Sequence, residues 1–307
     1  MIAPQPNFLL LKEIRATVLS LDTYIDKKIQ LGYDADYRLC STHHYQSGSM
    51  TNAATYRKNT LELLDMVAYR ADGQVTQTHA YSYNENGKLL TITGMDAAGT
   101  VVFSKNHCYD RNGILDYFEV HRNGKLHYWE SFHNDQYGLR DSYISGDAQR
   151  KLIQVYQYQN VMEKGRLAKV VALQNGELRH TVFYNGAGKP VKEVRFDHDQ
   201  QEMDVTRYIY SENGAPLLET RSHYGEEVFR AERSYDETGH LMEIRRICHG
   251  QLEQKVQYAY LDGRLLGYQS YTRGQLDAHY TYIYEPVYIS DAQAKVLSGL
   301  YAKLVLT

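Results

Sequence analysis

Pairs of tyrosines separated by one residue recur along this sequence, and they are the side chains most suited to binding a ligand. The chain has 29 Tyr but only 7 Phe and 1 Trp. In a strand, residues two apart share a face, so each pair would present two rings. Such rings can bind sugars or a protein surface, or they can pack across strands within a thin sheet, which is the role we expect at most positions. The candidate contact residues are Tyr81, Tyr83, Trp129, Tyr208, Tyr210, Tyr258, Tyr260, Tyr282 and Tyr284.

Titratable side chains form no recognised catalytic or metal-binding pattern. The acidic segment 197–204 could offer oxygens to Ca²⁺, but it lacks the glycine and spacing of an EF-hand, so we interpret it as a solvated turn. The histidines and cysteines that lie close together are Cys40, His43, His44, His107 and Cys108. They lack a second ligand pair at a metal-binding spacing. Phosphate-loop, nucleophile-elbow and zinc-protease motifs are also missing, so we expect no catalytic residue, no cofactor and no metal.

Glycines that precede an aliphatic residue recur at intervals that reveal a repeat. One series is Gly73, Gly99, Gly124, Gly176, Gly225, Gly250 and Gly274, and a second is Gly87, Gly113, Gly138, Gly188, Gly214, Gly239 and Gly263. Within each series the spacing is about 25 residues or about twice that. Imperfect copies at 146–152 and 199–203 fill two of the gaps, and Tyr37 takes the glycine position in the first repeat. Each repeat therefore contains two turns.

Turns about 12 residues apart leave room for strands of roughly 7–9 residues but not for helices. Asn-Gly at 86–87, 123–124 and 175–176 is typical of tight hairpins. The sequence therefore predicts an all-β fold, a long antiparallel up-and-down meander of roughly 16–20 strands. Because segments such as 115–120 mix apolar and charged residues on both faces, we expect a curved single-layer sheet or a wide, partly open barrel.

The whole chain, 1–307, is expected to form one domain, with repeats over 33–285 between two caps. Residues 1–32 could be a helix or two strands, and we favour strands. The C-terminal cap, 286–307, should contain a short helix over 290–301 that covers an edge or an open end of the sheet. Its expected N-cap is Ser290, and its expected apolar side contains Val296, Leu297, Leu300 and Leu304.

Composition argues against several functional classes. The net charge of −3 and the lack of a basic patch argue against nucleic-acid binding. Three cysteines without a paired motif are typical of a reducing compartment rather than of a disulfide framework. The sequence shows neither a basic signal-peptide start nor an apolar run of the ~18 residues that a membrane span needs. We therefore expect a cytoplasmic protein.

Several turn sequences resemble those of the YD (Rhs) repeat family, in which Tyr-x-Tyr-Asp-x-x-Gly-Arg-Leu precedes a second Gly. The best copies are 235–241 and 258–265, with looser ones at 83–89, 109–115 and 210–214, so the similarity covers roughly 33–285. The resemblance implies a β-sheet spiral that forms a hollow shell, often around a secreted toxin domain. This chain would be a short standalone member, because it shows no toxin-like C-terminal region and no autoproteolytic aspartyl signature. Residues 122–126 also resemble MORN-type repeats of antitoxin-like proteins.

These features favour a non-enzymatic scaffold that binds another protein, with a toxin domain among the candidate partners. One alternative is an immunity or chaperone-like protein of a bacterial toxin system. A second is a carbohydrate-binding module that uses its tyrosines, and a third is an enzyme whose site is assembled from distant strands in a barrel mouth. The oligomeric state is left open, because exposed edge strands could pair between copies.

Overall fold

A computed structural model describes residues 8–20, 23–56, 63–70, 72–287, 289 and 291–306. They form 22 strands and one helix. In chain order these elements are β1 (Phe8–Ser20), β2 (Thr23–Tyr33), β3 (Leu39–Gln46), β4 (Ser49–Tyr56), β5 (Leu63–Tyr69), β6 (Val75–Tyr83), β7 (Leu89–Asp96), β8 (Val101–Tyr109), β9 (Leu115–Arg122), β10 (Lys125–Asn134), β11 (Arg140–Asp147), β12 (Leu152–Glu163), β13 (Arg166–Gln174), β14 (Glu177–Tyr184), β15 (Pro190–Phe196), β16 (Glu202–Tyr210), β17 (Pro216–His223), β18 (Glu226–Tyr235), β19 (Leu241–Cys248), β20 (Gln251–Leu261), β21 (Arg264–Thr272), β22 (Gln275–Val287) and α1 (Asp291–Leu306).

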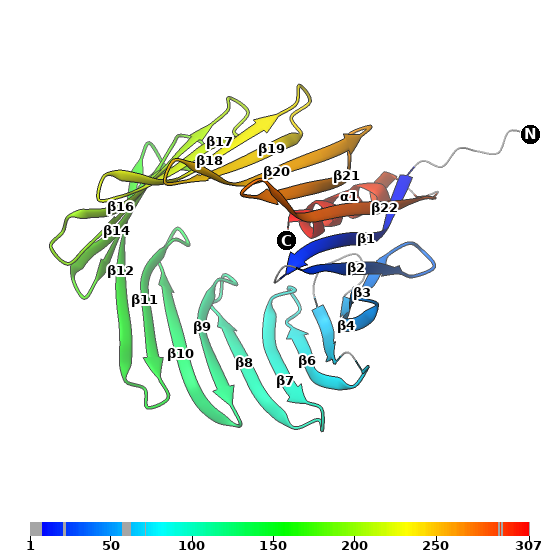
Figure 1. The fold of residues 1–307 in the computed structure, drawn as a ribbon. Helices are drawn as coiled ribbons and strands as arrows, with labels where there is room; N and C mark the ends of the chain where they lie inside the picture. The colour runs from blue at the N-terminus through cyan, green and yellow to red at the C-terminus, as the bar shows by residue number, and fades with distance from the viewer. Residues whose placement is uncertain are drawn as a thin grey trace, which may run out of the picture. The chain divides into compact units, whose positions relative to one another are not determined.

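Consecutive strands pair antiparallel from β1 to β7 and from β9 to β20 (Figure 1). The predicted all-β antiparallel meander with a C-terminal helix is confirmed. There are more strands than expected, because residues 8–33 supply two of them. Strands rather than a helix were the favoured prediction for this N-terminal segment. Strand β1 also pairs with β22, so the first and last strands of the meander are hydrogen-bonded to each other.

Contacts divide the chain into two compact units. Unit 1 contains Met1–Ser104, Tyr258–Ser270 and Leu276–Thr307, and unit 2 contains Lys105–Gln257 and Tyr271–Gln275. Unit 1 includes the helix, whereas the elements of unit 2 are all strands. The single-domain organisation drawn from the sequence stays a prediction.

One kind of turn explains why Asp or Asn follows the strand-ending tyrosine in the repeat. The side-chain oxygen of Asp236 accepts hydrogen bonds from the N–H groups of Thr238 and His240, at 3.0 and 2.8 Å. This arrangement replaces backbone hydrogen bonds that the reversal cannot supply. The same pair of bonds is made by Asp34, Asn84, Asp96, Asp110, Asp135, Asp147, Asn185 and Asp197.

The fourth position of these turns is left-handed, and it is usually glycine, as at Gly87 with φ 73°. Three turns have another residue there: Tyr37 at φ 58°, and Arg150 and Gln200 at φ 62°. This confirms that Tyr37 occupies a glycine position and that the imperfect copies at 146–152 and 199–203 form turns.

The other kind of turn is a two-residue reversal in which both residues have positive φ, as at Asn123–Gly124 with φ 49° and 74°. These values define the tight hairpin that asparagine and glycine favour. The two glycine series of the sequence do not separate the two kinds. Gly99 belongs to the same series as Gly124, yet it lies in an Asp96 turn. The sequence period therefore located the turns but did not identify their type.

The core of unit 1 lies where α1 packs on one face of β1, β2 and β22. It is made by Leu10, Leu11, Ile14, Leu31, Leu39, Tyr282, Val287, Leu297, Leu300 and Tyr301. The hydroxyl of Tyr301 accepts the Leu11 N–H at 3.1 Å, and the Tyr33 hydroxyl donates to the Leu11 carbonyl at 2.5 Å. The helix was expected to cover either an edge or an open end of the sheet. Because β1 and β22 are paired with each other, neither is a free edge, and the helix covers a face of these strands.

The expected apolar side of the helix is correct for Leu297 and Leu300, which are buried, but wrong for Val296, which is 42% exposed. Adjacent helix positions are about 100° apart, so a residue next to Leu297 need not share its side. Ser290, and the side chain of Leu304, lie outside the described residues.

Candidate functional site

One face of the unit 2 sheet collects tyrosines and charged residues, and we call it the tyrosine face. It is the face that carries Tyr158 and Tyr208. Residues directly across from one another in neighbouring strands share a face. The register runs from Tyr158 through Ala172, His180, Arg195 and Asp204, so the face is continuous from β12 to β16. It continues from Tyr208 through Glu219 and Ala231 to Arg246 in β19.

Toward β9 the tyrosine face carries a ladder of aromatic rings. The rings are those of Phe118, Phe132, Tyr143, Tyr156 and Tyr158, and successive centroids are 5.9, 5.5, 6.0 and 6.4 Å apart. Cations cover two of them, because the Lys105 ammonium is 3.6 Å from the Phe118 centroid and the Arg140 guanidinium is 4.1 Å from that of Phe132. These rings therefore pack across strands and against the chain's own cations, as the structural interpretation of the Tyr pairs expected.

Toward β18 the same face is ionic and contains a hollow of about 330 Å³. Thr206 lies directly across from Glu193 on one side and Arg221 on the other. A short side chain among long ones leaves space above it. The hollow is lined by Glu193, Arg195, Asp204, Thr206, Tyr208, Arg221, Ser222 and Val228. Strands β15 to β18 thus position two carboxylates, two guanidinium groups and a phenol around one small residue.

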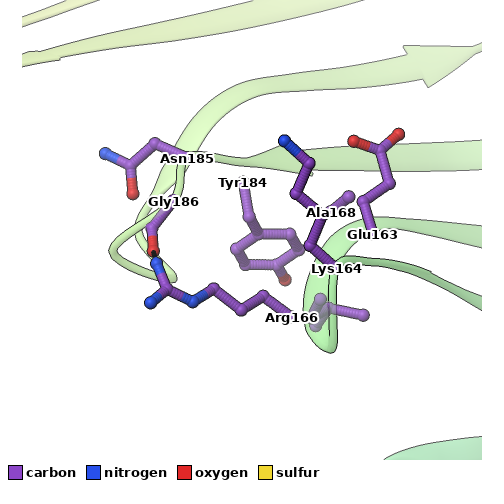
Figure 2. A pocket seen from close by; sticks show the side chains of 8 residues that line it. Glu163, Lys164, Arg166, Ala168, Tyr184, Asn185 and Gly186 are labelled. Carbon is purple, nitrogen blue, oxygen red and sulfur yellow. Dashed lines mark hydrogen bonds between the residues drawn. The ribbon is translucent and has the colours of Figure 1, made fainter.

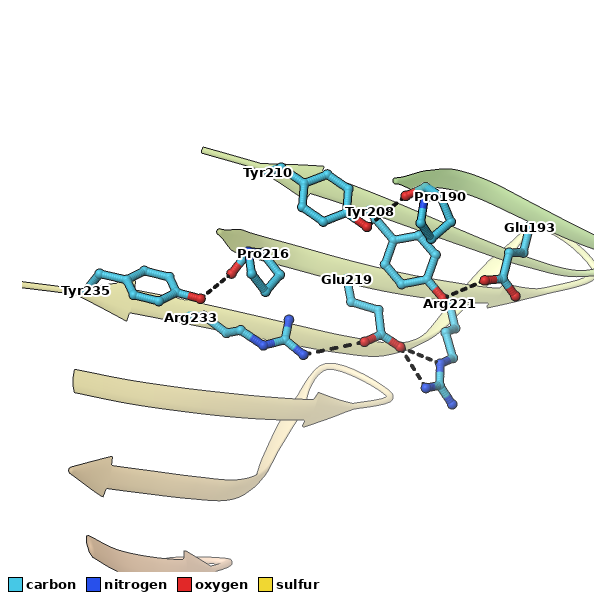
Figure 3. Close-up of polar contacts among 9 residues, drawn as sticks. All are labelled: Pro190, Glu193, Tyr208, Tyr210, Pro216, Glu219, Arg221, Arg233 and Tyr235. Atoms are coloured by element: carbon cyan, nitrogen blue, oxygen red, sulfur yellow. Dashed lines mark hydrogen bonds and ion pairs between the residues drawn. The ribbon is translucent and has the colours of Figure 1, made fainter. Parts of the chain in front are cut away.

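Hydrogen bonds hold the acidic groups of this region in place (Figure 3). Glu219 accepts two bonds from Arg221, at 2.9 and 2.6 Å, and its other oxygen is 3.6 Å from Arg233. The Tyr208 hydroxyl donates to Glu193 at 3.0 Å, and Asp204 is 2.8 Å from His223 Nδ1. Each carboxylate is therefore already paired within the sheet.

Burial and the Glu193 charge raise the pKa of Tyr208 to about 12, so the phenol stays protonated. We expect Glu193→Gln to move this pKa back toward 10, because it removes the negative charge beside the hydroxyl. In the wild type the unfolded chain releases this proton near pH 10 and the folded chain does not, so the stability contribution is full below pH 10 and is lost as pH rises toward 12. ¹³C-tyrosine NMR titration, with Tyr208→Phe to assign the signal, measures it. An unchanged midpoint in Glu193→Gln would contradict the assigned cause.

Several tyrosines that end strands donate to a carbonyl far back in the chain, and this gives them a structural role. The Tyr210 hydroxyl binds the Pro190 carbonyl at 2.8 Å, and the Tyr235 hydroxyl binds that of Pro216 at 2.9 Å (Figure 3). Tyr284, which lies within β22 rather than at its end, also donates to a distant carbonyl, that of Leu265, at 2.9 Å. Tyr235 was not among the predicted contact residues, although its place before Asp236 in the repeat could have identified it.

The structure does not gather the nine predicted contact residues into one site. Tyr208, Tyr210 and Trp129 belong to unit 2, and the other six belong to unit 1. In unit 1, Tyr282 is buried in the core, whereas the remaining five are half-buried: Tyr81, Tyr83, Tyr258, Tyr260 and Tyr284. Among the predicted residues, Tyr208 alone lines the ionic hollow. Its charged neighbours were missed because they meet only across strands.

Trp129 lies on the opposite face of the sheet from Phe132, where it packs against Gly146 directly across from it. Tyr117 flanks the indole at 6.1 Å, and the Arg150 guanidinium lies 5.7 Å from its centroid. Arg150 also binds Glu119 at 2.6 Å. The single tryptophan is therefore half-buried and packed, and its ring is enclosed on several sides.

Gly146→Ala is expected to destabilise unit 2 by about 1–2 kcal/mol, because the new methyl group overpacks the site. A Cβ atom at Gly146 would lie 2.4 Å from the indole Nε1, so the ring would have to move. Urea unfolding followed by Trp129 fluorescence measures both the stability and the shift of the ring. Gly186→Ala is the control, since its Cβ would meet nothing nearer than 3.7 Å. Equal stabilities of the two variants would refute the packing interpretation.

A second hollow, of about 400 Å³, lies between the hairpin turns that follow β12 and β14 (Figure 2). Arg166 extends across it and donates to the Gly186 carbonyl at 2.5 Å (Figure 2). Tyr184, Glu163 and Lys164 also line it. Since the one guanidinium here is bound to a turn carbonyl, this hollow offers fewer free groups than the hollow around Thr206.

Other predicted features can be placed in the same way. Asp197, in the acidic segment, uses one oxygen to bind its own turn and the other to accept the Tyr224 hydroxyl at 3.1 Å. Within the described residues, no three His, Cys, Asp or Glu side chains are grouped so that they could hold a metal ion. The helix that the structure describes is not long and apolar enough to cross a membrane.

Comparisons with known proteins do not assign this chain to a family. No protein-family model and no curated protein sequence matches it. A Tc holotoxin pore from Photorhabdus luminescens aligns with 82% of this chain at 10% identity and a TM-score of 0.29, and a TcdB2–TccC3 structure aligns with 91% at 13% and 0.30. The matched region is 18% of each of those chains. A porin-like protein from Bacteroides uniformis aligns with 92% of this chain, and 99% of its own, at 13% identity and a TM-score of 0.32. TM-scores this low carry no argument about fold or function.

Proposed function

We propose that the chain is a non-enzymatic scaffold that binds another protein through the tyrosine face of unit 2. The observation that carries this proposal is the ionic hollow around Thr206, which lies on the same face as the aromatic ladder. Tyrosine and arginine are among the residues that protein interfaces favour. The hollow is open to solvent, since the Arg221 side chain is 56% exposed.

The chemistry of the hollow supports binding rather than catalysis. A general base or nucleophile works best with a pKa near the working pH. Here burial and the Glu193 charge raise the pKa of Tyr208, which moves it away from the working pH. The three nearby carboxylates also have partners within the sheet. The aromatic ladder favours a protein partner over a glycan, because its rings face one another or a cation instead of offering a flat free surface.

The turn sequences make a bacterial toxin domain the first partner to test. If the partner is such a domain, the chain would act as an immunity or chaperone-like protein. We also propose a cytoplasmic location, which the three free cysteines support: Cys40, Cys108 and Cys248.

Affinity capture with matched bait variants tests the proposal. Thr206→Trp fills the hollow, whereas Thr220→Trp adds the same side chain to the opposite face, where Thr220 lies directly across from Arg207. We expect the wild type and Thr220→Trp to retain one protein stoichiometrically from the native host at physiological salt, and Thr206→Trp to lose it. Retention by all three baits would exclude this face, and capture of no protein would contradict the proposed function.

A further inference from the structure

The ionic half of the tyrosine face carries both arginines and carboxylates. Its guanidinium groups are those of Arg195, Arg221, Arg233 and Arg246, and its carboxylates are those of Glu193, Asp204, Glu219 and Glu226. Four cations stand against four anions, so the net charge does not decide what the hollow binds. The groups that lack a partner decide it.

The three carboxylates nearest the hollow already have partners within the sheet. Glu219 is bound by two arginines, Glu193 accepts the Tyr208 hydroxyl, and Asp204 is paired with His223. A partner's lysine or arginine would have to break one of these pairs, so the hollow does not favour a cation.

Three of the four arginines are also engaged. Arg221 and Arg233 bind Glu219, and Arg246 donates to the Gln254 side chain. Arg195 is exposed and lines the hollow, and its side chain forms neither a hydrogen bond nor an ion pair with any residue that the structure describes. Arg195 is therefore the arginine of this hollow whose guanidinium has no partner among the described residues.

Further donors lie beside Arg195 in the same hollow. Arg221 uses its Nε and Nη2 atoms to bind Glu219, which leaves its Nη1 group available. The Thr206 hydroxyl, between Glu193 and Arg221, makes no hydrogen bond within the described part of the chain. An anionic oxygen in the hollow would thus meet one unpaired guanidinium, part of a second and a hydroxyl.

We infer that this hollow binds the side-chain carboxylate of an aspartate or glutamate on a protein partner, with Arg195 as its main ligand; the inference rests on the proposed function. The planar guanidinium can donate two parallel hydrogen bonds to one carboxylate, which gives direction as well as attraction. The guanidinium of Arg195 selects this occupant, since it is cationic and has no partner, whereas Glu193 and Asp204 beside it already bind Tyr208 and His223. The volume of about 330 Å³ suits a side chain rather than a folded element.

A titration that needs no identified partner tests the inference. The full chain, labelled with ¹⁵N-arginine, is titrated with N-acetyl-glutamate methylamide and, separately, with the glutamine analogue. We expect the Arg195 side-chain signal, assigned with Arg195→Gln, to shift saturably with the glutamate compound, with a dissociation constant on the order of millimolar for one isolated ion pair. The glutamine compound should leave the signal in place.

Matched variants separate the site from general charge attraction. The Arg221 side-chain signal, which both Arg195 variants keep, reports their binding of the glutamate compound. Arg195→Gln should weaken that binding about tenfold or more, and Arg195→Lys should weaken it less, because lysine keeps the charge but cannot donate two parallel hydrogen bonds to one carboxylate. The control is Arg207→Gln, in which an exposed arginine on the opposite face of β16 is replaced, and this variant should bind like the wild type. Unchanged Trp129 fluorescence confirms that each variant is folded.

The inference is overturned by the absence of a saturable shift, by an equal response to the glutamine compound, or by full binding of the glutamate compound to Arg195→Gln. Inorganic phosphate that displaces the glutamate compound at equal concentration would show a general anion site and would also overturn it. The capture experiment is independent of this titration. If Thr206→Trp loses a partner while the titration shows no carboxylate binding, the proposed function stands and the carboxylate site does not.

Discussion

Replacing Leu297 with alanine is expected to lower the free energy of unfolding of unit 1 by about 3 kcal/mol. Leu297 is fully buried in the cluster that joins α1 to β1, β2 and β22. The loss combines the transfer free energy of the removed methyl groups with the cost of the cavity that they leave. Urea unfolding followed by circular dichroism measures the change.

Val296→Ala is the matched control for this prediction. Val296 is adjacent in the helix but exposed, so the same kind of truncation should change stability by less than about 0.5 kcal/mol. Amide hydrogen exchange in α1 distinguishes global destabilisation from release of the helix alone. If the two variants unfold at the same urea concentration and their α1 amides exchange alike, the helix does not dock as described.

Replacing Gly267 with alanine is expected to destabilise unit 1 by about 3 kcal/mol, toward the upper end of what overpacking costs. A Cβ atom at this position would lie 2.1 Å from the Tyr280 carbonyl oxygen and 3.5 Å from the Thr281 Cα. Both are backbone atoms, so relief requires β21 and β22 to separate, whereas at Gly146 a side chain can rotate. Thermal and urea unfolding of the full chain measure the effect.

Gly299→Ala serves as the opposite case. The added Cβ would have open space around it, and alanine favours a helix over glycine by about 1 kcal/mol, so this variant should be more stable than the wild type. A Gly267→Ala variant as stable as the wild type would show that the two strands are not so closely spaced. A destabilised Gly299→Ala variant would contradict the exposed surface of α1 at that position.

The repeat made the positions of the turns predictable from the sequence, but not their conformations. Turn positions were predictable because a tight reversal restricts which residues fit, and the restriction is local. This was true even where Arg150 replaces glycine, since the Asp147 side chain still binds the turn. The kind of turn was not predictable from the glycine series, because the same glycine serves both conformations.

The candidate site was less accessible to sequence reasoning. Tyr208 was predicted because it stands in a conspicuous pair, but the same logic selected Tyr282, which is buried core, and Tyr210, whose hydroxyl binds Pro190. Arg195 was missed because it stands in an unremarkable segment. Its importance depends on which carboxylates across neighbouring strands already have partners.

The sequence by itself determined that the chain is an antiparallel meander, where it reverses and that a helix follows the last strand. Those features depend on backbone preferences and periodicity, which act over a few residues. Only the tertiary structure decided that β1 pairs with β22, that α1 covers a face of the sheet, and that Thr206 lies within a ring of charged groups. These depend on the register between strands and on side chains that meet across them, and a shift of one residue would turn each strand's side chains to the other face.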